Sequence, residues 1–167
     1  MTLETLLESR DRRAAHQRKL LAEWPASTLI CLTVQLPGPV KRDSRSLIIG
    51  GAGLAALMEK FGSTLQHVQV KDLETGYEAY LIVPLPAALV KQICCKIEDT
   101  HPLGRLMDID VLSGSGRAPH AIDRPSVGLQ PRRCLLCGNE VRFCMRARTH
   151  TPQELQARID EMIKAYV

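Results

Sequence analysis

Aromatic residues are scarce in this chain of 167 residues: one Trp, three Tyr and two Phe make up 4% of it. Proteins that bind single-stranded nucleic acid stack bases on aromatic side chains, so this composition argues against such a partner. No apolar run reaches the roughly 20 residues that a helix needs to cross a bilayer, so we expect no membrane association. The first residues are acidic and Arg-rich, unlike a secretory signal.

These absences predict a cytoplasmic protein. The six Cys residues would there be reduced thiols or metal ligands rather than disulfides. With 45% hydrophobic residues, the chain is long enough for one compact domain. We expect an N-terminal helix over residues 1–24, an α+β core over 27–113 and an Arg- and Cys-rich C-terminal segment over 117–167.

Positive charge is concentrated in one region of the chain. The formal net charge is +4, and Arg outnumbers Lys fifteen to seven. Seven Arg lie from Arg117 to Arg148, with only two acids, Asp123 and Glu140. A guanidinium can bind phosphate through two parallel hydrogen bonds. The distribution therefore predicts a discrete polyphosphate ligand or an acidic protein partner.

The order of the expected elements predicts the fold. Apolar periodicity and turn residues predict helices over 2–23, 43–61 and 87–99, and strands over 27–36, 64–71, 77–83 and 107–111. From residue 27 onward this is the order of a ferredoxin-like, split βαβ core. It gives a four-stranded antiparallel sheet with both helices on one face, leaving the other face to a ligand, the N-terminal helix or the C-terminal segment. Residues 113–116 predict a turn, 117–131 an irregular stretch, and 151–166 a last helix with a capping box.

Two aspartates stand out in the last strand. Side chains alternate between the faces of a strand, so Met107, Ile109 and Val111 would face a core, and Asp108 and Asp110 would share the other face. Two carboxylates so placed can bind Mg²⁺ or Mn²⁺ for phosphoryl or nucleotidyl transfer. The alternative is a solvated strand face.

Several cationic or small residues could contact phosphate. Gly104 and Arg105 lie just before the aspartates, where a bare turn and a guanidinium could meet an anion. Lys41 follows the rigid turn over 37–39 and leads into a helix N-terminus, which is a plausible anion site or an ordinary connection. In the N-terminal helix we expect one side to carry Leu3, Leu6, Leu7, Arg10, Ala14, Gln17 and Leu21.

The C-terminal segment carries a candidate metal site. Cys134, Cys137, Cys144 and His150 form a Cys-x₂-Cys-x₆-Cys-x₅-His series. Three thiolates and an imidazole suit tetrahedral Zn²⁺, and such a site would be structural. The alternative is that Leu135, Leu136, Cys137 and Cys144 are simply small buried residues.

The stretch His101-Pro-Leu-Gly-Arg-Leu-Met-Asp-Ile-Asp-Val111 resembles the signature of a known family, the apo-citrate lyase phosphoribosyl-dephospho-CoA transferases, also called citrate lyase holo-acyl-carrier-protein synthases. Further blocks resemble the same family in the same order: Ser9-Arg-Asp-Arg12 with Gln17, Pro37-Gly-Pro-Val-Lys41, Pro131-Arg-Arg-Cys-Leu-Leu-Cys137, and Cys144 with His150. Together they span nearly the whole chain.

The resemblance implies an activity. The family transfers the 2′-(5″-phosphoribosyl)-3′-dephospho-CoA group from triphosphoribosyl-dephospho-CoA to a serine of the citrate lyase acyl carrier protein, and diphosphate leaves. Asp108 and Asp110 would then bind the metal, with Arg105 at the leaving group and His101 as a candidate base or a structural residue. The ligand-binding candidates are Arg10, Arg12, Gln17, Lys41, Gly104, Arg132 and Arg133.

A second hypothesis is a protein without catalytic activity. In that case the Cys/His series would hold a zinc knuckle whose Arg-rich face binds RNA or an acidic protein. The low aromatic content speaks against RNA. The enzyme needs a divalent cation at the aspartates, whereas the binding module needs only zinc at the cysteines.

Overall fold

The computed structural model describes residues 1–114 and 118–167. The turn predicted over 113–116 therefore lies partly outside the described residues. The helices are α1 (Leu3–Glu23), α2 (Ser44–Phe61), α3 (Ala87–Thr100), α4 (Val141–Ala147) and α5 (Pro152–Tyr166). The strands are β1 (Thr28–Val34), β2 (His67–Leu73), β3 (Gly76–Val83), β4 (Met107–Ser113) and β5 (His120–Ala121).

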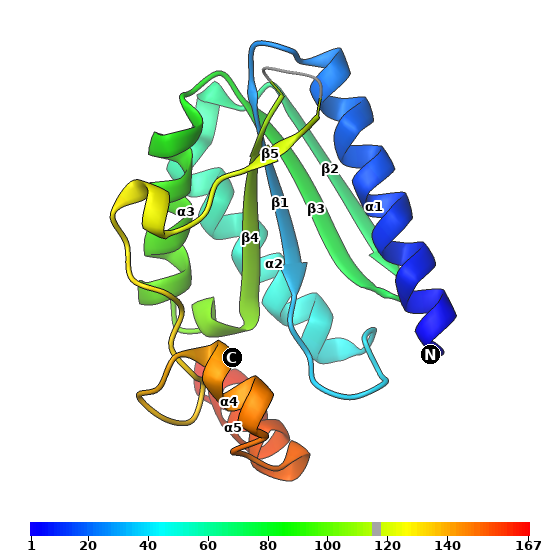
Figure 1. Ribbon diagram of the computed structural model, residues 1–167, viewed down its shortest axis with the longest axis vertical. Coiled ribbons are helices and arrows are strands. Elements are labelled where there is room, and N and C mark those ends of the chain that lie inside the picture. Colours follow the sequence, from blue (N-terminus) through cyan, green and yellow to red (C-terminus); the bar gives the residue numbers. More distant parts are fainter. Residues whose placement is uncertain (115–117) are drawn as a thin grey trace.

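The strands form one antiparallel sheet in the order β2-β3-β1-β4-β5 (Figure 1). The first four positions have the order of a split βαβ core, so the predicted α+β fold is confirmed. The sheet has five strands rather than the predicted four, because His120 and Ala121 pair with Ser113 and Leu112. The prediction of an irregular stretch over 117–131 is wrong at these two residues, since so short a strand leaves no alternating pattern in the sequence.

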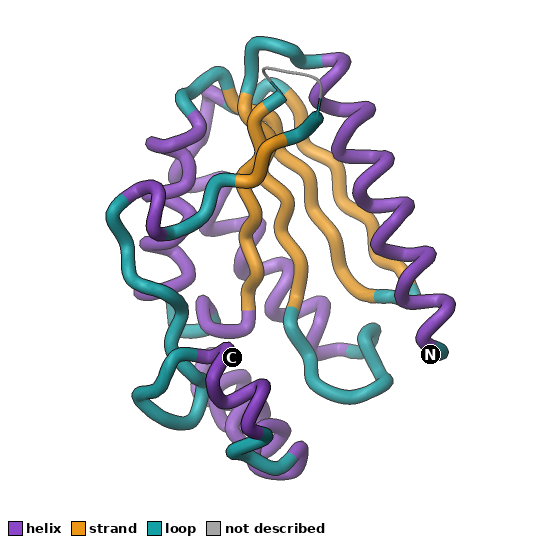
Figure 2. The backbone as a smooth tube through the Cα atoms, viewed as in Figure 1, coloured by secondary structure: helices purple, strands orange, loops and turns teal. Residues whose placement is uncertain are grey.

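Helices α2 and α3 cover one face of the sheet, as predicted (Figure 2). Leu32 of β1, Ile109 of β4 and Ile49 of α2 are completely buried between these layers. The glycine at position 50 permits this close packing, because a Cβ there would lie 2.4 Å from the ring of Tyr77. Helix α2 can therefore lie directly on the ring of Tyr77 in β3.

Helix α1 packs on the opposite face, where Leu20 and Leu21 join a second buried cluster. The side of this helix that carries the predicted leucines is covered only in its second half, since Leu3 and Leu7 are 72% and 49% exposed. Arg13 turns toward the sheet instead, because its Nε donates to the buried carboxylate of Glu78 at 3.1 Å. A polar contact in the middle of α1 therefore adds to the apolar packing of Leu20 and Leu21 on the sheet.

The C-terminal helices lie together at one end of the molecule (Figure 1). The capping box that opens α5 at Thr151 is present as predicted. Ile159 and Ile163 of α5 belong to the same buried apolar cluster as the core residues of α2 and α3. Across residues 1–114 and 118–167, the structure shows no helix with the length and apolar character that a membrane crossing requires.

Candidate active site and metal cluster

The aspartate pair projects from β4 on the side away from α2 and α3. Met107, Ile109 and Val111 are completely buried, whereas Asp108 is half-buried and Asp110 is exposed. This alternation follows from strand geometry. It places both carboxylates on the same side of the sheet, as the sequence predicted.

The outer edge of β4 is bound by side chains instead of a full neighbouring strand, because β5 pairs with only two of its residues. The amide of Ile109 donates to Oε1 of Glu98 at 2.8 Å, and its carbonyl accepts from Nζ of Lys91 at 3.1 Å. Both side chains come from α3 and are buried. The peptide between the two aspartates is therefore fixed on both sides, and the directions of the carboxylates are fixed with it.

Arg132 binds the same strand from the C-terminal segment. Its Nη2 donates to the carbonyls of Met107 and Arg105 at 2.8 and 3.1 Å, and its Nη1 lies 3.4 Å from Oδ1 of Asp108. One guanidinium thus joins the loop after β5 to the start of β4. It also brings a positive charge to the rim of the aspartate pair.

The carboxylates of Asp108 and Asp110 line a cleft of about 370 Å³. Its walls come from β4, from α3 and from the segment after β5. The lining residues are Lys91, Glu98, Asp108, Asp110, Ala121, Ile122, Asp123, Arg124, Pro125, Pro131, Arg132, Glu140, Val141 and Arg142. The cleft therefore presents acids on one strand and arginines on the facing segment.

Asp110 has unusual electrostatics. Burial among the walls of the cleft raises its pKa to about 6, and the negative charge of Asp108 adds to the effect. Lys91 acts in the opposite direction through its positive charge. The carboxylate keeps contact with solvent through the mouth of the cleft while protein atoms surround its other sides. Two neighbouring carboxylates in such a site favour binding of a cation.

A second cavity, of about 520 Å³, lies beside the first and shares Arg124 and Pro131 with it. Arg105, Arg133 and Asp99 contribute to its lining. Among the described residues the guanidinium of Arg105 forms no salt bridge; burial together with the charge of Arg132 lowers its pKa, and the charge of Asp99 acts in the opposite direction. A half-buried guanidinium without a salt bridge is suited to binding an anion.

The three ligand-binding candidates on α1 do not all lie on the side of the helix that faces β4. Gln17 contacts the thiol of Cys31, which pairs with Asp110 across the β1–β4 ladder. Arg10 lies two helical turns earlier on the same side of α1 and is exposed. Arg12 is exposed on another side of the helix. Gln17 and Arg10 are therefore directed toward the open face of β4, whereas Arg12 is not.

Three other candidates make contacts that hold the fold. Nδ1 of His101 accepts from the amide of Leu103 at 3.0 Å, which favours its structural role over that of a base. Gly104 is buried, and a Cβ there would lie 2.4 Å from the carbonyl oxygen of Glu98. Lys41 donates through Nζ to the carbonyl of Leu36. None of the three is among the described residues that line the cleft.

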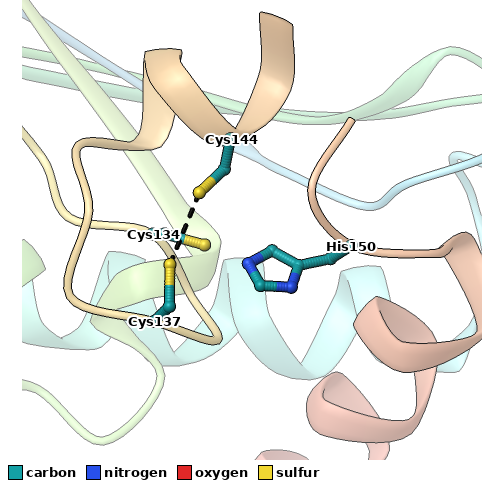
Figure 3. A group of neighbouring side chains, drawn as sticks. All are labelled: Cys134, Cys137, Cys144 and His150. Carbon is teal, nitrogen blue, oxygen red and sulfur yellow. Dashed lines mark hydrogen bonds between the residues drawn. The ribbon is translucent and has the colours of Figure 1, made fainter. Parts of the chain in front are cut away.

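The structure brings Cys134, Cys137, Cys144 and His150 together (Figure 3). One ligand atom from each lies within 4.8 Å of the others, and the Sγ atoms of Cys137 and Cys144 are 3.4 Å apart. Cys144 comes from α4, and the remaining members come from the loops on either side of it. We call these four residues the Cys/His cluster; their donor set fits a tetrahedral metal ion.

The surroundings of the cluster also fit a metal ion. Nε2 of His150 is buried without a hydrogen-bond partner among the described residues, and such an atom is costly unless it binds something. Burial by itself would raise the pKa of Cys134, but hydrogen bonds from the amides of Leu136 and Cys137 outweigh it and lower the pKa to about 7. A thiol that ionises easily is a better metal ligand.

Two residues that shape this site were not identified from the sequence. Lys91 and Glu98 bind the Ile109 peptide, but in the sequence they do not differ from the other charged residues of the same helix, Lys96 and Asp99. Glu98 also pairs with the buried guanidinium of Arg124 at 2.5 Å. The one available signal is their spacing, because residues seven apart lie on the same side of a helix. Only the packing of α3 against β4 shows that this side meets a strand edge.

Fold and site together define an α+β protein in which an aspartate pair and an arginine-lined cleft adjoin a Cys/His cluster. The family model described as "Apo-citrate lyase phosphoribosyl-dephospho-CoA transferase" matches residues 1–166. The chain belongs to this family, which confirms the resemblance seen in the sequence.

The names of individual relatives agree with the description of the family. A protein of Vibrio cholerae serotype O1 is 36% identical over 170 residues, covering 99% of this chain and 93% of its own. One of Streptococcus pyogenes serotype M3 is 34% identical over 165 residues, covering 98% of this chain and 86% of its own. Both are named probable apo-citrate lyase phosphoribosyl-dephospho-CoA transferase. Protein CitXG of Haemophilus influenzae is 32% identical over 165 residues, which cover 97% of this chain and 35% of that protein.

Proposed function

We propose that this protein transfers the 2′-(5″-phosphoribosyl)-3′-dephospho-CoA group from triphosphoribosyl-dephospho-CoA to a serine of the apo citrate lyase acyl carrier protein, releasing diphosphate. Membership of the family and the names of the relatives support this substrate pair. The observation that carries the proposal is the aspartate pair on a fixed strand edge, facing the arginines of one cleft. We further propose that residues 1–167 act as one domain in the cytoplasm.

Asp108 and Asp110 are the residues that would hold Mg²⁺ or Mn²⁺. They fit such an ion because two carboxylates share one face of β4 and no described residue donates a hydrogen bond to the side-chain carboxylate of Asp110. Bound there, the ion would supply Lewis-acid stabilisation of charge on the phosphate oxygens. Glu98 and Lys91 hold the peptide between the two aspartates, so little reorganisation of the carboxylates would be needed.

In this nucleotidyltransferase-type reaction, the serine hydroxyl gives up its proton to the solvent and its oxygen forms a bond to the phosphorus next to the ribose, while the bond from that phosphorus to the diphosphate breaks. The leaving diphosphate gains negative charge as it departs. Arg105, Arg132 and Arg133 lie on the adjoining walls of the two cavities and would bind the donor and the leaving group. Gln17 and Arg10 would contact the donor from the α1 side of β4.

The Cys/His cluster is the second part of the proposal. Three thiols, a buried imidazole nitrogen without a partner and a thiol of lowered pKa fit one structural Zn²⁺. The loop that supplies Cys134 begins with Arg132 and Arg133. The cluster would therefore hold these arginines against β4, and would position residues without taking part in the chemistry.

The test is incubation of the apo carrier protein with triphosphoribosyl-dephospho-CoA, Mg²⁺ and this protein, followed by intact mass measurement of the carrier. We expect the mass of the carrier to increase by that of the transferred group, and the increase to require both the donor and the divalent cation. A carrier variant with the acceptor Ser replaced by Ala is the control. An unchanged carrier mass with zinc-loaded, fully folded protein would overturn the proposal in favour of the non-catalytic binding module.

A further inference from the structure

The outward surface of α4 is apolar and cationic at once. Phe143 and Met145 are 57% and 72% exposed, although both are side chains that usually lie inside a protein. Arg142 and Arg146 are exposed on the same helix. A surface that combines large apolar residues with Arg and lies beside a cleft has the composition of a protein interface.

The geometry of the helix sets the order of these side chains. Cys144 faces inward to the Cys/His cluster (Figure 3). Arg142 and Arg146, four residues apart, then lie one above the other on the outward side. Phe143 and Met145 lie on the two flanks of this arginine ridge. We call these four residues the α4 surface.

The charge of this region is unbalanced. From residue 132 to residue 149 the chain carries five Arg and a single acid, Glu140. Among the residues that the structure describes, Arg142, Arg146 and Arg148 form no ion pair. Arg45 shows the contrast, because it pairs with Asp43 and Asp160. Arginines without acidic neighbours attract a partner of negative charge.

The α4 surface is continuous with the cleft. Glu140, Val141 and Arg142, where α4 begins, line the same cleft as Asp108 and Asp110. A macromolecule bound on α4 would therefore lie at the mouth of that cleft. One of its side chains could then enter while the rest of its surface stays on the helix.

We propose that the α4 surface is the docking site for the carrier protein, which it recognises as an acidic protein with an apolar patch beside its acceptor serine. This inference rests on the proposed transferase function. The carboxylates of the partner would meet Arg142 and Arg146, and its apolar patch would cover Phe143 and Met145. RNA fits the surface less well, because Phe143 is its only aromatic side chain for stacking.

The experiment measures transfer to the apo carrier protein with Arg146→Glu and with the double variant Phe143→Ala/Met145→Ala. Each is expected to raise the KM for the carrier about tenfold or more, with the KM for the donor and the zinc content unchanged. Raised ionic strength should increase the carrier KM of the unmodified protein more than that of Arg146→Glu. The matched controls are Arg18→Glu on α1 and Met58→Ala on α2, two exposed positions that should leave both KM values unchanged.

The outcomes separate this inference from the proposed function. If the unmodified protein transfers no group to the carrier, the proposed function is lost and the docking site with it. If the unmodified protein is active but both α4 variants keep a normal carrier KM, only the docking site is wrong. Loss of binding to a fluorescent single-stranded RNA, with carrier KM unchanged, would assign the surface to nucleic acid instead. A change in the donor KM in step with the carrier KM would place these residues in the cleft.

Discussion

The edge of β4 and the Cys/His cluster adjoin each other but are held in different ways. Around β4, a central sheet, two buried helical side chains and the guanidinium of Arg132 fix the backbone through hydrogen bonds. Around the cluster, Cys144 lies on α4, a helix of seven residues that is too short to be stable alone, and a single β-bridge joins Arg133 to Glu140. The first region is organised by protein contacts, whereas the second brings together four ligand atoms that could hold a metal ion, and we propose that the ion stabilises it.

The difference matters for the site because Arg132 belongs to both regions. Its guanidinium binds β4, while its carbonyl accepts from the amide of Val141 at the start of α4. Cys134 follows two residues later. A change at the cluster should therefore reach the cleft through the arginines, whereas a change at the aspartates should stay local.

The largest effect is expected at the aspartates. Asp108→Asn and Asp110→Asn keep the shape of the side chains and remove one negative charge each, so we expect transfer to fall about a thousandfold with the fold unchanged. Initial rates by intact mass at several Mg²⁺ concentrations measure this. Near-native rates of both variants at limiting Mg²⁺ would show that the metal site lies elsewhere.

Removal of the cluster metal should affect the second region selectively. We expect about one zinc per chain in protein purified without added metal, and its loss in Cys134→Ser. Amide hydrogen exchange should then rise across residues 132–150 while β1 and β3 remain protected. Cys94→Ser serves as the control for thiol loss outside the cluster. Fully folded, reduced protein without zinc would show that the four residues are simply buried neighbours.

The buried ion pair behind β4 should be important for stability. Glu98→Ala leaves the guanidinium of Arg124 and the amide of Ile109 without that partner, so we expect a loss of about 3 kcal/mol in the free energy of unfolding. The exposed pair of Arg158 and Glu161 is the comparison, because Glu161→Ala should cost less than about 0.5 kcal/mol. Urea unfolding measures both. Equal losses would mean that the edge of β4 is not held as described.

The smallest effect concerns pH. The pKa of Asp110 is raised to about 6 in the folded protein, so its contribution to stability is favourable below its unfolded pKa and is lost as the pH rises through 6. Without divalent cations, Asp110→Asn should therefore be more stable than the unmodified protein at pH 7.5, by about 1 kcal/mol after allowance for solvent screening. The difference should vanish near pH 4. A constant difference across this range would contradict the assignment.

Some of the site follows from local rules that the sequence obeys by itself. Because side chains alternate along a strand, Asp108 and Asp110 had to share a face, and the order of the elements gave the split βαβ core. The capping box at Thr151 and the spacing of Cys134 and Cys137 are equally local. Each depends on residues close together in the chain, where covalent geometry leaves few alternatives.

Other features arose only when distant segments met. Lys91 and Glu98 became ligands of the Ile109 peptide because α3 packs beside an edge that β5 leaves largely unpaired. Arg13 turned toward the sheet because a buried carboxylate of β3, that of Glu78, lies beneath it. The sequence by itself determined which residues alternate, cap and pair locally. The tertiary structure decided that the outer edge of β4 stays largely without a neighbouring strand and that the charges of Lys91 and Glu98 are buried beside it. The reason is that both features depend on contacts between segments that are far apart in the chain.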